Sequence, residues 1–194
     1  TIIMKELLKK VTEGQNLTRE EAAKAMDMML EGTASPVLVS AFLTALRMKG
    51  ETVDEIVGCT EMMKSKGGSV KLDTDEYIDF VGTGGDGANS FNISTTSMFV
   101  CAAAGVTVAK HGNRAASSKS GASDLLEALG ANIMLEPKQV EQCINETGMG
   151  FMNAMKFHKA MKNVGPIRKQ IGIRTIFNML GPLSNPSKAS RQVI

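Results

Sequence analysis

The hydrophobic pattern of this chain changes at about residue 71, and that change limits the possible folds more than any other feature. Ahead of it, apolar residues recur at helical spacing, as Ile3, Leu7 and Val11 do on one face of the first segment. Beyond it, short apolar runs alternate with helical segments, a pattern typical of a parallel sheet covered by helices. We therefore predict an α/β fold, in which a small all-helical domain precedes a larger parallel-sheet domain.

Capping residues mark the helix boundaries of the first domain. Thr18 with Glu21, and Thr52 with Glu55, have the spacing of a capping box, and Ser35–Pro36 reads as an N-cap followed by the first helical residue. Each predicted helix ends at a glycine, where a left-handed backbone closes the last turn. These glycines are Gly14, Gly32, Gly50 and the pair Gly67–Gly68.

Strands and helices alternate in the rest of the chain. The predicted strands are 77–81, 106–109 and 131–134. The predicted helices are 94–104, 123–129 and 137 to about 148. Such alternation is typical of parallel strands joined by helices.

The helical pattern returns late, at residues 158–180. We therefore predict two domains: a helical one over 1–70 that is rejoined by about 165–185, and an α/β one made of 71–164 and 186–194. The last residues, Arg191–Ile194, read as the start of a strand. Because domains seldom finish on an unpaired apolar strand, we expect the sequence to be part of a longer protein.

Composition and charge argue against several classes of protein. The formal net charge is +2 and the Lys and Arg residues are dispersed, so we expect no nucleic-acid partner and no membrane partner. No apolar run is long enough to span a bilayer, and the N-terminus lacks the apolar core of a signal peptide. The three cysteines have no metal-ligand spacing, so we expect buried, reduced thiols in a cytoplasmic protein.

A glycine-rich segment follows the first predicted strand. Four of the six residues from Gly82 to Gly87 are glycine, which lets the backbone approach a ligand and gathers N–H groups in one concavity suited to phosphate. Asp86 within it requires a cation or a hydroxyl partner, such as magnesium or a sugar. The spacing is neither that of a dinucleotide fingerprint nor that of a P-loop, and a tight loop without a ligand is the alternative.

A helix begins at Asn92–Thr96, directly after the glycine-rich segment. Ser and Thr at such a position are ordinary N-caps. The helix start also points free N–H groups and a favourable dipole toward any anion held by the glycines. The hydroxyls of Ser94 and Thr95 are oxygen ligands of the kind that magnesium or a phosphate group accepts.

A third polar segment runs from Lys110 to Gly121, after the predicted strand 106–109. It carries three cations, a histidine and several hydroxyls between apolar segments. Loops at the C-terminal ends of parallel strands share one crevice, so we expect this segment to face the glycines. A solvated basic loop is the alternative, but the density of polar groups favours a site for pyrophosphate and ribose.

Taken in order, these segments resemble the anthranilate phosphoribosyltransferase family. The matching motifs are GTGGD from Gly82, NIST from Asn92, KHGNR from Lys110, SSKSG from Ser117 and GIRTIFN from Gly172. The resemblance implies a fold of the nucleoside phosphorylase and phosphoribosyltransferase type. It implies transfer of a phosphoribosyl group from phosphoribosyl pyrophosphate to anthranilate in tryptophan biosynthesis. It also implies Mg²⁺ as cofactor and a homodimer formed through the N-terminal helices.

The resemblance further implies roles for individual residues. Anthranilate would contact Gly82, Asn113 and Arg168, and Ser94 would be a magnesium ligand. The residues implied to bind phosphoribosyl pyrophosphate are Gly82, Gly85, Asp86, Ser90, Asn92, Ile93, Ser94, Thr95, Lys110, His111, Gly112, Asn113, Arg114, Ser117 and Ser118. No residue is assigned a catalytic role beyond positioning the substrates, because the aromatic amine is already a nucleophile.

Three departures from the family pattern bear on these implications. Ala122 and then Ser123 follow SSKSG where the family has Ser before Ala, which moves a phosphate-contacting hydroxyl by one position. The stretch 153–159 replaces a more apolar, proline-containing segment near the acceptor. The family's acidic magnesium-binding pair lies beyond Ile194, so we expect the 194-residue chain alone not to turn over anthranilate.

Two other interpretations stay open. A related phosphoribosyltransferase or a nucleoside phosphorylase with another acceptor would share this architecture, although Asn113 and Arg168 favour anthranilate. A non-catalytic paralogue that binds nucleic acid or another partner would carry a basic face, which the near-neutral charge disfavours.

Overall fold

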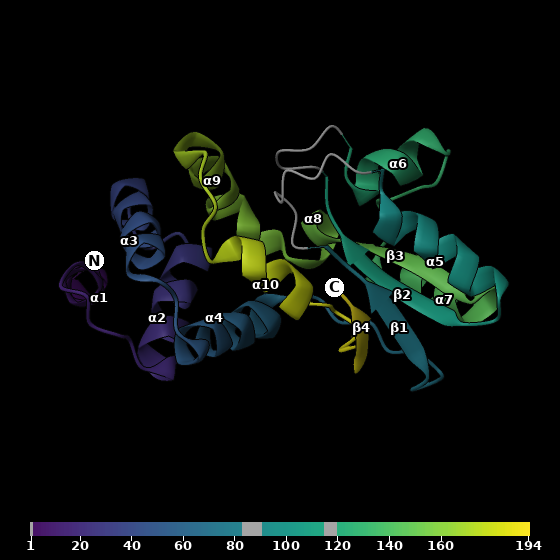
Figure 1. Cartoon of the computed structure of the whole chain (residues 1–194), viewed down its shortest axis with the longest axis horizontal. Coiled ribbons are helices and arrows are strands. Elements are labelled where there is room, and N and C mark those ends of the chain that lie inside the picture. Colours follow the sequence, from purple (N-terminus) through teal and green to yellow (C-terminus); the bar gives the residue numbers. More distant parts are fainter. Residues whose placement is uncertain (1, 83–90, 115–119) are drawn as a thin grey trace. The chain divides into compact units, whose positions relative to one another are not determined.

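The chain divides into two compact units in a computed structural model that describes residues 2–82, 91–114 and 120–194. Unit 1 holds the residues up to Gly67 together with Lys159–Leu183, and unit 2 holds Gly68–His158 and Ser184–Ile194. Figure 1 shows that unit 1 is built of helices and that unit 2 is built around a sheet. Each unit is described by itself below.

Unit 1 contains the four predicted N-terminal helices and three later ones. The first four are α1 (Ile2–Thr12), α2 (Arg19–Leu30), α3 (Pro36–Lys49) and α4 (Val53–Lys66). The later stretch adds the 3₁₀ helix η1 (Lys159–Asn163), α9 (Gly165–Ile171) and α10 (Phe177–Leu183). Residues Lys159–Leu183 thus add helices to the unit that holds the first four.

Both predicted capping boxes are formed. The Thr18 hydroxyl accepts a hydrogen bond from the Glu21 N–H at 3.2 Å, and the Glu21 carboxylate accepts one from the Thr18 N–H at 3.0 Å. Thr52 and Glu55 exchange the same two bonds at 3.3 and 2.7 Å. These bonds satisfy N–H groups that the first turn of a helix leaves open, so local chemistry fixes where α2 and α4 begin.

Glu55 is also a buried anchor of unit 1. Its Oε1 accepts a hydrogen bond from the Leu17 N–H at 2.9 Å, and its Oε2 lies 3.0 Å from the Lys49 Nζ. Burial by itself raises the pKa of this carboxyl, but the hydrogen bonds from Leu17, Thr52 and Lys49 outweigh burial and hold the pKa below its ordinary value. Glu55 therefore stays ionised and ties α4 to the end of α3 and to the chain before α2.

Helices α2 and α4 approach each other closely at Gly58. A Cβ at this position would lie 2.1 Å from the Arg19 carbonyl oxygen and 3.2 Å from the Ala23 nitrogen. The neighbouring Cys59 is buried, and burial raises the pKa of its thiol to about 12, with the Glu55 charge acting in the same direction. Only a glycine at position 58 lets the two helix backbones come this close.

Unit 2 is built on a parallel sheet of the described strands β1 (Tyr77–Phe80), β2 (Thr107–Gly112), β3 (Met149–Asn153) and β4 (Arg191–Val193). The strand order is β3-β2-β1-β4. Together with the helices of unit 1, this sheet confirms the predicted fold class. The chain passes to the other side of β1 when it reaches β4, and ligands of open α/β sheets bind beyond the carboxyl ends of strands at such a switch.

Helices cover both faces of the sheet. On one face, α5 (Ile93–Ala103) packs through a core that includes Phe80, Met98 and Val108. On the other face, α7 (Pro137–Thr147) packs its Ile144 into a core that includes Ala109. Val108 and Ala109 are successive residues of β2, and successive side chains of a strand point to opposite faces. The short helices α6 (Ala122–Ala128) and α8 (Ala154–Phe157) complete the unit.

The predicted strand at 131–134 is wrong. The chain turns after Gly130, whose φ is 86°, and the Asn132 Oδ1 accepts a hydrogen bond from the Met134 N–H at 3.0 Å. This local bond replaces pairing with a neighbouring strand. The third strand is instead β3, which lacks the β-branched residues by which sequence patterns identify strands.

Among the residues that the structure describes, the helices are too short or too polar to span a bilayer. All three cysteines are free thiols. Cys59 is buried as expected, but Cys101 of α5 and Cys143 of α7 are only partly buried. Cys101 packs against the core that includes Phe80 and Met98 without being enclosed by it.

Candidate functional site

The carboxyl ends of the strands gather the predicted polar residues of unit 2 at one edge of the sheet. β2 runs to Gly112 and not to residue 109 as predicted, so Lys110 and His111 belong to the strand itself. Both are buried, at 2% and 3% exposure. Their place in a strand fixes their directions, because successive side chains point to opposite faces. The sequence pattern had placed them in a loop, since charged residues rarely continue a buried strand.

The ladder between β1 and β2 stops short of this edge. Its paired positions are Tyr77 with Thr107 and Ile78 with Val108, although both strands continue. The Val108 N–H donates to the Gly148 carbonyl on the β3 side, so the N–H of residue 111 faces β1. Regular parallel pairing would place that N–H opposite the carbonyl of residue 80.

Side chains replace the missing part of the ladder. The Asp79 Oδ1 accepts a hydrogen bond from the His111 N–H at 3.1 Å. The Lys110 Nζ donates to the Phe80 carbonyl, and the Asn185 Nδ2 donates to the Ala109 carbonyl at 3.0 Å. The sheet therefore ends in a cluster of buried polar side chains, where its backbone groups need partners other than each other.

Lys110 is the buried cation of this cluster. Besides the Phe80 carbonyl, the Ser94 Oγ lies within reach of its Nζ at 3.3 Å. Burial lowers the pKa of the ammonium to about 8, and the negative charge of Asp79 opposes that effect. An ammonium has three donors, and the described residues supply two acceptors. A phosphate group would provide an acceptor for the third N–H of the ammonium and a negative charge beside it.

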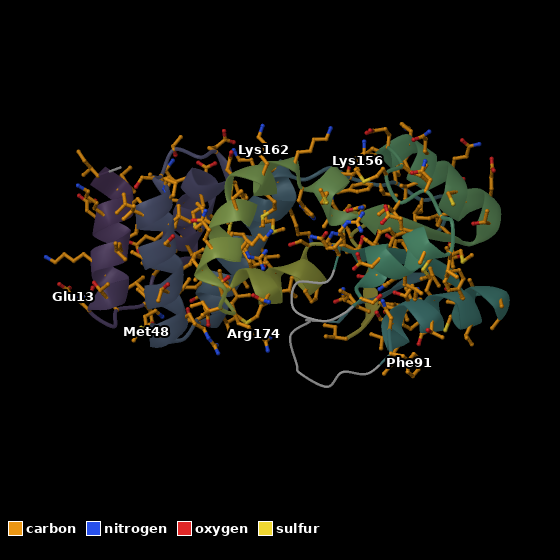
Figure 2. All side chains as sticks on the ribbon, turned by 90° about the horizontal axis from the view of Figure 1, so that it is seen from above. Glu13, Met48, Phe91, Lys156, Lys162 and Arg174 are labelled. Carbon is orange, nitrogen blue, oxygen red and sulfur yellow. The ribbon has the colours of Figure 1, made fainter. Side chains whose placement is uncertain are left out.

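The start of α5 lies beside Lys110. Asn92 caps the helix, since its Oδ1 accepts hydrogen bonds from the Thr95 N–H at 3.2 Å and from the Ser94 hydroxyl at 3.4 Å. Thr95 is fully buried, whereas Ile93 is 54% exposed. Phe91, labelled in Figure 2, is also exposed ahead of the helix. The Lys110–Ser94 contact brings the second and third predicted segments together.

Arg114 is engaged by carboxylates of α6. Its Nη1 lies 2.8 Å from a Glu127 oxygen and 3.0 Å from an Asp124 oxygen. The hydrogen bonds to Glu127 and Asp124 raise the pKa of the guanidinium. Arg114 thereby fastens the end of β2 to α6, and its contact with a ligand stays a prediction. Gly112 before it is needed for close packing, since a Cβ there would lie 2.8 Å from the Phe151 ring.

The Ala122–Ser123 order places a hydroxyl inside the fold. Ser123 is fully buried and its N–H donates to the Asn113 carbonyl at 3.2 Å. Its Oγ has no hydrogen-bond partner in the part of the chain that the structure describes. The hydroxyl that the family places one position earlier is thus replaced by a methyl group at Ala122, which is partly exposed.

Replacing Ser123 by alanine is expected to raise the free energy of unfolding by ~1 kcal/mol, because a buried hydroxyl without a partner costs about that much. Urea denaturation measures the change. Ser97→Ala, at a partly exposed position of α5, is the matched control for the helix-forming advantage of alanine. A Ser123→Ala variant no more stable than that control would show that the hydroxyl is satisfied.

His111 and His158 form a ring pair on the face opposite to Lys110. Their centroids lie 5.2 Å apart with the ring planes at 69°. The His158 Nε2 lies 3.1 Å from the Ser184 carbonyl oxygen, to which it donates. Burial lowers the pKa of His158 below its ordinary value, and the Ser184 carbonyl acts in the opposite direction. Burial therefore favours the neutral form of His158 in the folded protein.

Acidification is expected to destabilise the protein through His158. Between about pH 7.5 and about pH 5.5, His158 binds a proton more readily in the unfolded state than in the folded state. The free energy of unfolding therefore has its full value above pH ~6.5 and decreases as the pH falls toward the folded pKa. The chain has two histidines, so few other groups titrate in this window. Urea midpoints at both pH values should fall less in His158→Gln than in the parent protein. Equal falls would contradict the assignment.

The stretch 153–159 is locally ordered. The buried Asn153 caps α8 by accepting a hydrogen bond from the Met155 N–H at 3.0 Å. Lys156, labelled in Figure 2, pairs with Glu136, while Phe157 lies in the core. Met155 is 57% exposed, where the resemblance led us to expect a proline-containing segment.

Arg168 belongs to unit 1, on α9. Its guanidinium carbon lies 5.0 Å from the centre of the Phe177 ring. Burial lowers its pKa from the ordinary value. Within the described residues no hydrogen bond or ion pair of this guanidinium is found. A half-buried cation stacked on an aromatic ring, with its donors unused, is suited to a carboxylate.

Several predicted residues fall outside the described part of the chain, namely Gly85, Asp86, Ser90, Ser117 and Ser118. Gly82, the last described residue before the first gap, is exposed. Two site residues were not predicted, Asp79 and Asn185. The signal for Asp79 was present, since it is the charged residue within the apolar strand 77–81. In the described ranges, no group of three or more His, Cys, Asp or Glu side chains is arranged to hold a metal ion.

Two family models match the chain. Residues 74–194 match the α/β domain of a glycosyl transferase family, and residues 5–67 match a helical bundle domain of a glycosyl transferase family. The matched regions leave few residues of the chain unassigned. The helical and α/β parts are therefore both accounted for by known domains.

Curated relatives cover almost the whole chain. The anthranilate phosphoribosyltransferase of Acetivibrio thermocellus is 54% identical over 192 residues, which are 99% of this chain and 56% of that protein. The anthranilate phosphoribosyltransferase of Nitrobacter hamburgensis is 56% identical over 191 residues, with 98% and 56% coverage. The chain thus spans somewhat more than half the length of the curated relatives it matches, and the resemblance stated from the motifs is confirmed.

Solved structures of anthranilate phosphoribosyltransferases resemble the fold of this chain. A crystal structure of anthranilate phosphoribosyltransferase from Thermus thermophilus has a TM-score of 0.90 at 44% identity, covering 96% of this chain and 57% of that one. The enzyme from Saccharomyces cerevisiae, in complex with PRPP and Mg, has a TM-score of 0.88 at 30% identity, covering 97% and 57%.

Proposed function

Because the chain belongs to the glycosyl transferase family with a helical bundle domain and an α/β domain, we propose that it forms the donor-binding part of an anthranilate phosphoribosyltransferase. The proposed reaction joins the phosphoribosyl group of phosphoribosyl pyrophosphate to the amine of anthranilate and releases pyrophosphate. It belongs to tryptophan biosynthesis. The relatives named above support this proposal, and the chain covers 56% of the length of the first of them.

Buried Lys110 is the observation that carries the proposal. Its ammonium lies at the carboxyl edge of a parallel sheet, 3.3 Å from the Ser94 hydroxyl at the start of α5. A buried cation without a full set of acceptors is costly unless an anion joins it. The helix start adds a dipole that favours negative charge. Pyrophosphate, the group that leaves the donor, matches both features.

Magnesium fits this edge only as part of the donor complex. The Ser94 hydroxyl and the Asn92 carboxamide are oxygen ligands of the right type, but the Lys110 ammonium beside them would repel a bare cation. Mg²⁺ commonly binds through substrate phosphates and a few protein oxygens. We propose that Ser94 supplies one such oxygen. The ion, when bound with the donor, would neutralise charge on the leaving pyrophosphate.

For the acceptor we propose Asn113 and Arg168. The Arg168 guanidinium, which stacks on the Phe177 ring, suits the anthranilate carboxylate. The carboxamide of Asn113 follows directly after β2 at the donor edge. Anthranilate needs no strong base to attack, since its amine already carries a lone pair. The protein's contribution is then to hold both reactants in line and to stabilise the departing pyrophosphate.

Calorimetry tests the proposal. The 194-residue chain is titrated with phosphoribosyl pyrophosphate in the presence of MgCl₂, and then with anthranilate. We expect saturable donor binding that depends on Mg²⁺, followed by anthranilate binding to the donor complex. Donor binding with no response to anthranilate, but with a response to a pyrimidine base, would favour the alternative acceptor. Absence of any donor binding would sink the proposal.

Two further expectations belong to the proposal. A homodimer through the N-terminal helices is supported by exposed apolar side chains on α1 and α3, Ile2 and Val37 among them. Phe42 and Leu46 of α3 are in the core of unit 1 and are not available for it. Light scattering at two protein concentrations measures the mass. A cytoplasmic location is supported by the free thiols.

A further inference from the structure

Asp79 is a fully buried carboxylate to which no role in substrate binding has been assigned above. It lies in the middle of β1, at 0% exposure, one residue before the Phe80 carbonyl that receives Lys110. A carboxylate is rarely buried unless hydrogen bonds and a countercharge hold it there. The surroundings of Asp79 provide both.

The two carboxylate oxygens have separate partners on the two neighbouring strands. Oδ1 accepts the His111 N–H of β2 at 3.1 Å. Oδ2 accepts the Gln192 Nε2 of β4 at 2.9 Å. Lys110, on the strand next to it, is the cation to which the Asp79 charge is attracted. One side chain therefore spans three strands at the edge where the candidate donor site lies.

The contact with His111 stands where a ladder bond is missing. The paired positions of β1 and β2 end at Ile78 and Val108, and three residues further along β2 the His111 N–H donates to a side chain of β1. Asp79 takes over that N–H, while Lys110 takes over the Phe80 carbonyl. Regular pairing would join the His111 N–H to the Phe80 carbonyl, and here a side chain binds each of these two groups instead. The Lys110 ammonium lies where the two strands are no longer paired, between the Phe80 carbonyl and the Ser94 hydroxyl.

We propose that Asp79 is a positioning residue of the donor site, holding the end of β2 at the spacing from β1 that directs Lys110 toward the donor phosphates. Asp79 itself touches no substrate in this proposal. The proposal rests on the donor-binding function above. It predicts that the bond to His111, and not the bond to Gln192, controls donor affinity.

Three variants separate these contacts. Asp79→Ala removes both bonds. Asp79→Asn keeps an oxygen for the His111 N–H but loses the charge. Gln192→Ala removes the bond from β4 to Asp79 and leaves the His111 bond in place. Hydrogen exchange of the His111 amide, followed by NMR, reports the β2 contact directly. Calorimetry with phosphoribosyl pyrophosphate and MgCl₂ reports donor affinity. Urea denaturation reports stability for each variant.

We expect Asp79→Ala to bind the donor about tenfold more weakly and to lose protection of the His111 amide, since a buried N–H loses its charged acceptor. Asp79→Asn should stay within about threefold of the parent chain with the amide protected, because a neutral acceptor replaces a charged one. Gln192→Ala should keep both affinity and protection, even where it loses stability.

Other outcomes overturn the inference. If donor affinity falls in parallel with the free energy of unfolding in all three variants, Asp79 stabilises the fold and does not position Lys110. Asp79→Asn as weak as Asp79→Ala, with the His111 amide still protected, would mean that the charge and not the positioning bond matters. A parent chain that binds no donor contradicts the proposed function instead, while the amide exchange still tests the contact with β2.

Discussion

Replacing Gly58 by alanine is expected to lower the free energy of unfolding of unit 1 by at least ~3 kcal/mol, at the upper end of what overpacking costs. The added Cβ would lie 2.1 Å from the Arg19 carbonyl oxygen, a distance that no rotamer change relieves because the obstacle is backbone. α2 and α4 would have to move apart. That movement would disturb the apolar core of unit 1, to which Met26 and Met29 of α2 belong.

The expected effect of Gly58→Ala is opposite in sign to the usual effect of alanine in a helix. Alanine normally stabilises a helix by about 1 kcal/mol relative to glycine. Gly165→Ala is the matched control, since Gly165 begins α9 and a Cβ there meets nothing within 4 Å. Urea and thermal unfolding, followed by circular dichroism, should show Gly58→Ala destabilised and Gly165→Ala unchanged or improved. A Gly58→Ala variant as stable as the parent would mean that α2 and α4 pack less closely.

Replacing Lys110 by methionine is expected to weaken binding of phosphoribosyl pyrophosphate by about a hundredfold, or ~3 kcal/mol, the effect of losing a charge-assisted contact in a buried setting. Methionine keeps most of the side-chain volume but provides no donor. The Phe80 carbonyl and the Ser94 hydroxyl both lose the ammonium. The Asp79 charge loses its cation as well, so stability is measured alongside affinity.

Lys138→Met is the control for charge alone. The Lys138 side chain is 93% exposed on α7, so its replacement changes net charge equally without touching the sheet edge. Calorimetry with donor and MgCl₂ should give the parent affinity for this variant. A folded Lys110→Met protein that binds the donor as the parent does would remove Lys110 from the site.

The sequence predicted the fold well where local chemistry decides it. The boxes at Thr18 and Thr52 fix helix starts through side chains that bond to their own backbone, and such bonds can be identified from spacing alone. The prediction of a strand at 131–134 was wrong because pairing with a neighbouring strand, and not local sequence, decides which segment joins the sheet. That stretch and β3 have similar apolar content, and only the neighbouring β2 selects which of them pairs.

The candidate site was predicted in its residue types more than in its arrangement. Lys110 and Ser94 were both predicted, and their contact follows from the parallel order of the strands. The extension of β2 to Gly112 and the role of Asp79 could not be predicted, because they depend on where the ladder between β1 and β2 ends. A pattern of hydrophobicity shows that a strand is buried but not where it leaves its neighbour.

The order of the strands has a consequence for biosynthesis. Asp79 in β1 meets Gln192 in β4 across 113 residues of chain, whereas β2 and β3 follow β1 much sooner. During translation, β1, β2 and β3 can associate while one side of β1 still has no partner. Long-range pairing of this kind folds slowly and leaves a strand edge exposed to other chains. Unit 1 is likewise incomplete until Lys159–Leu183 has been synthesised. The edge of β1 can therefore be covered only after the chain has been synthesised as far as β4.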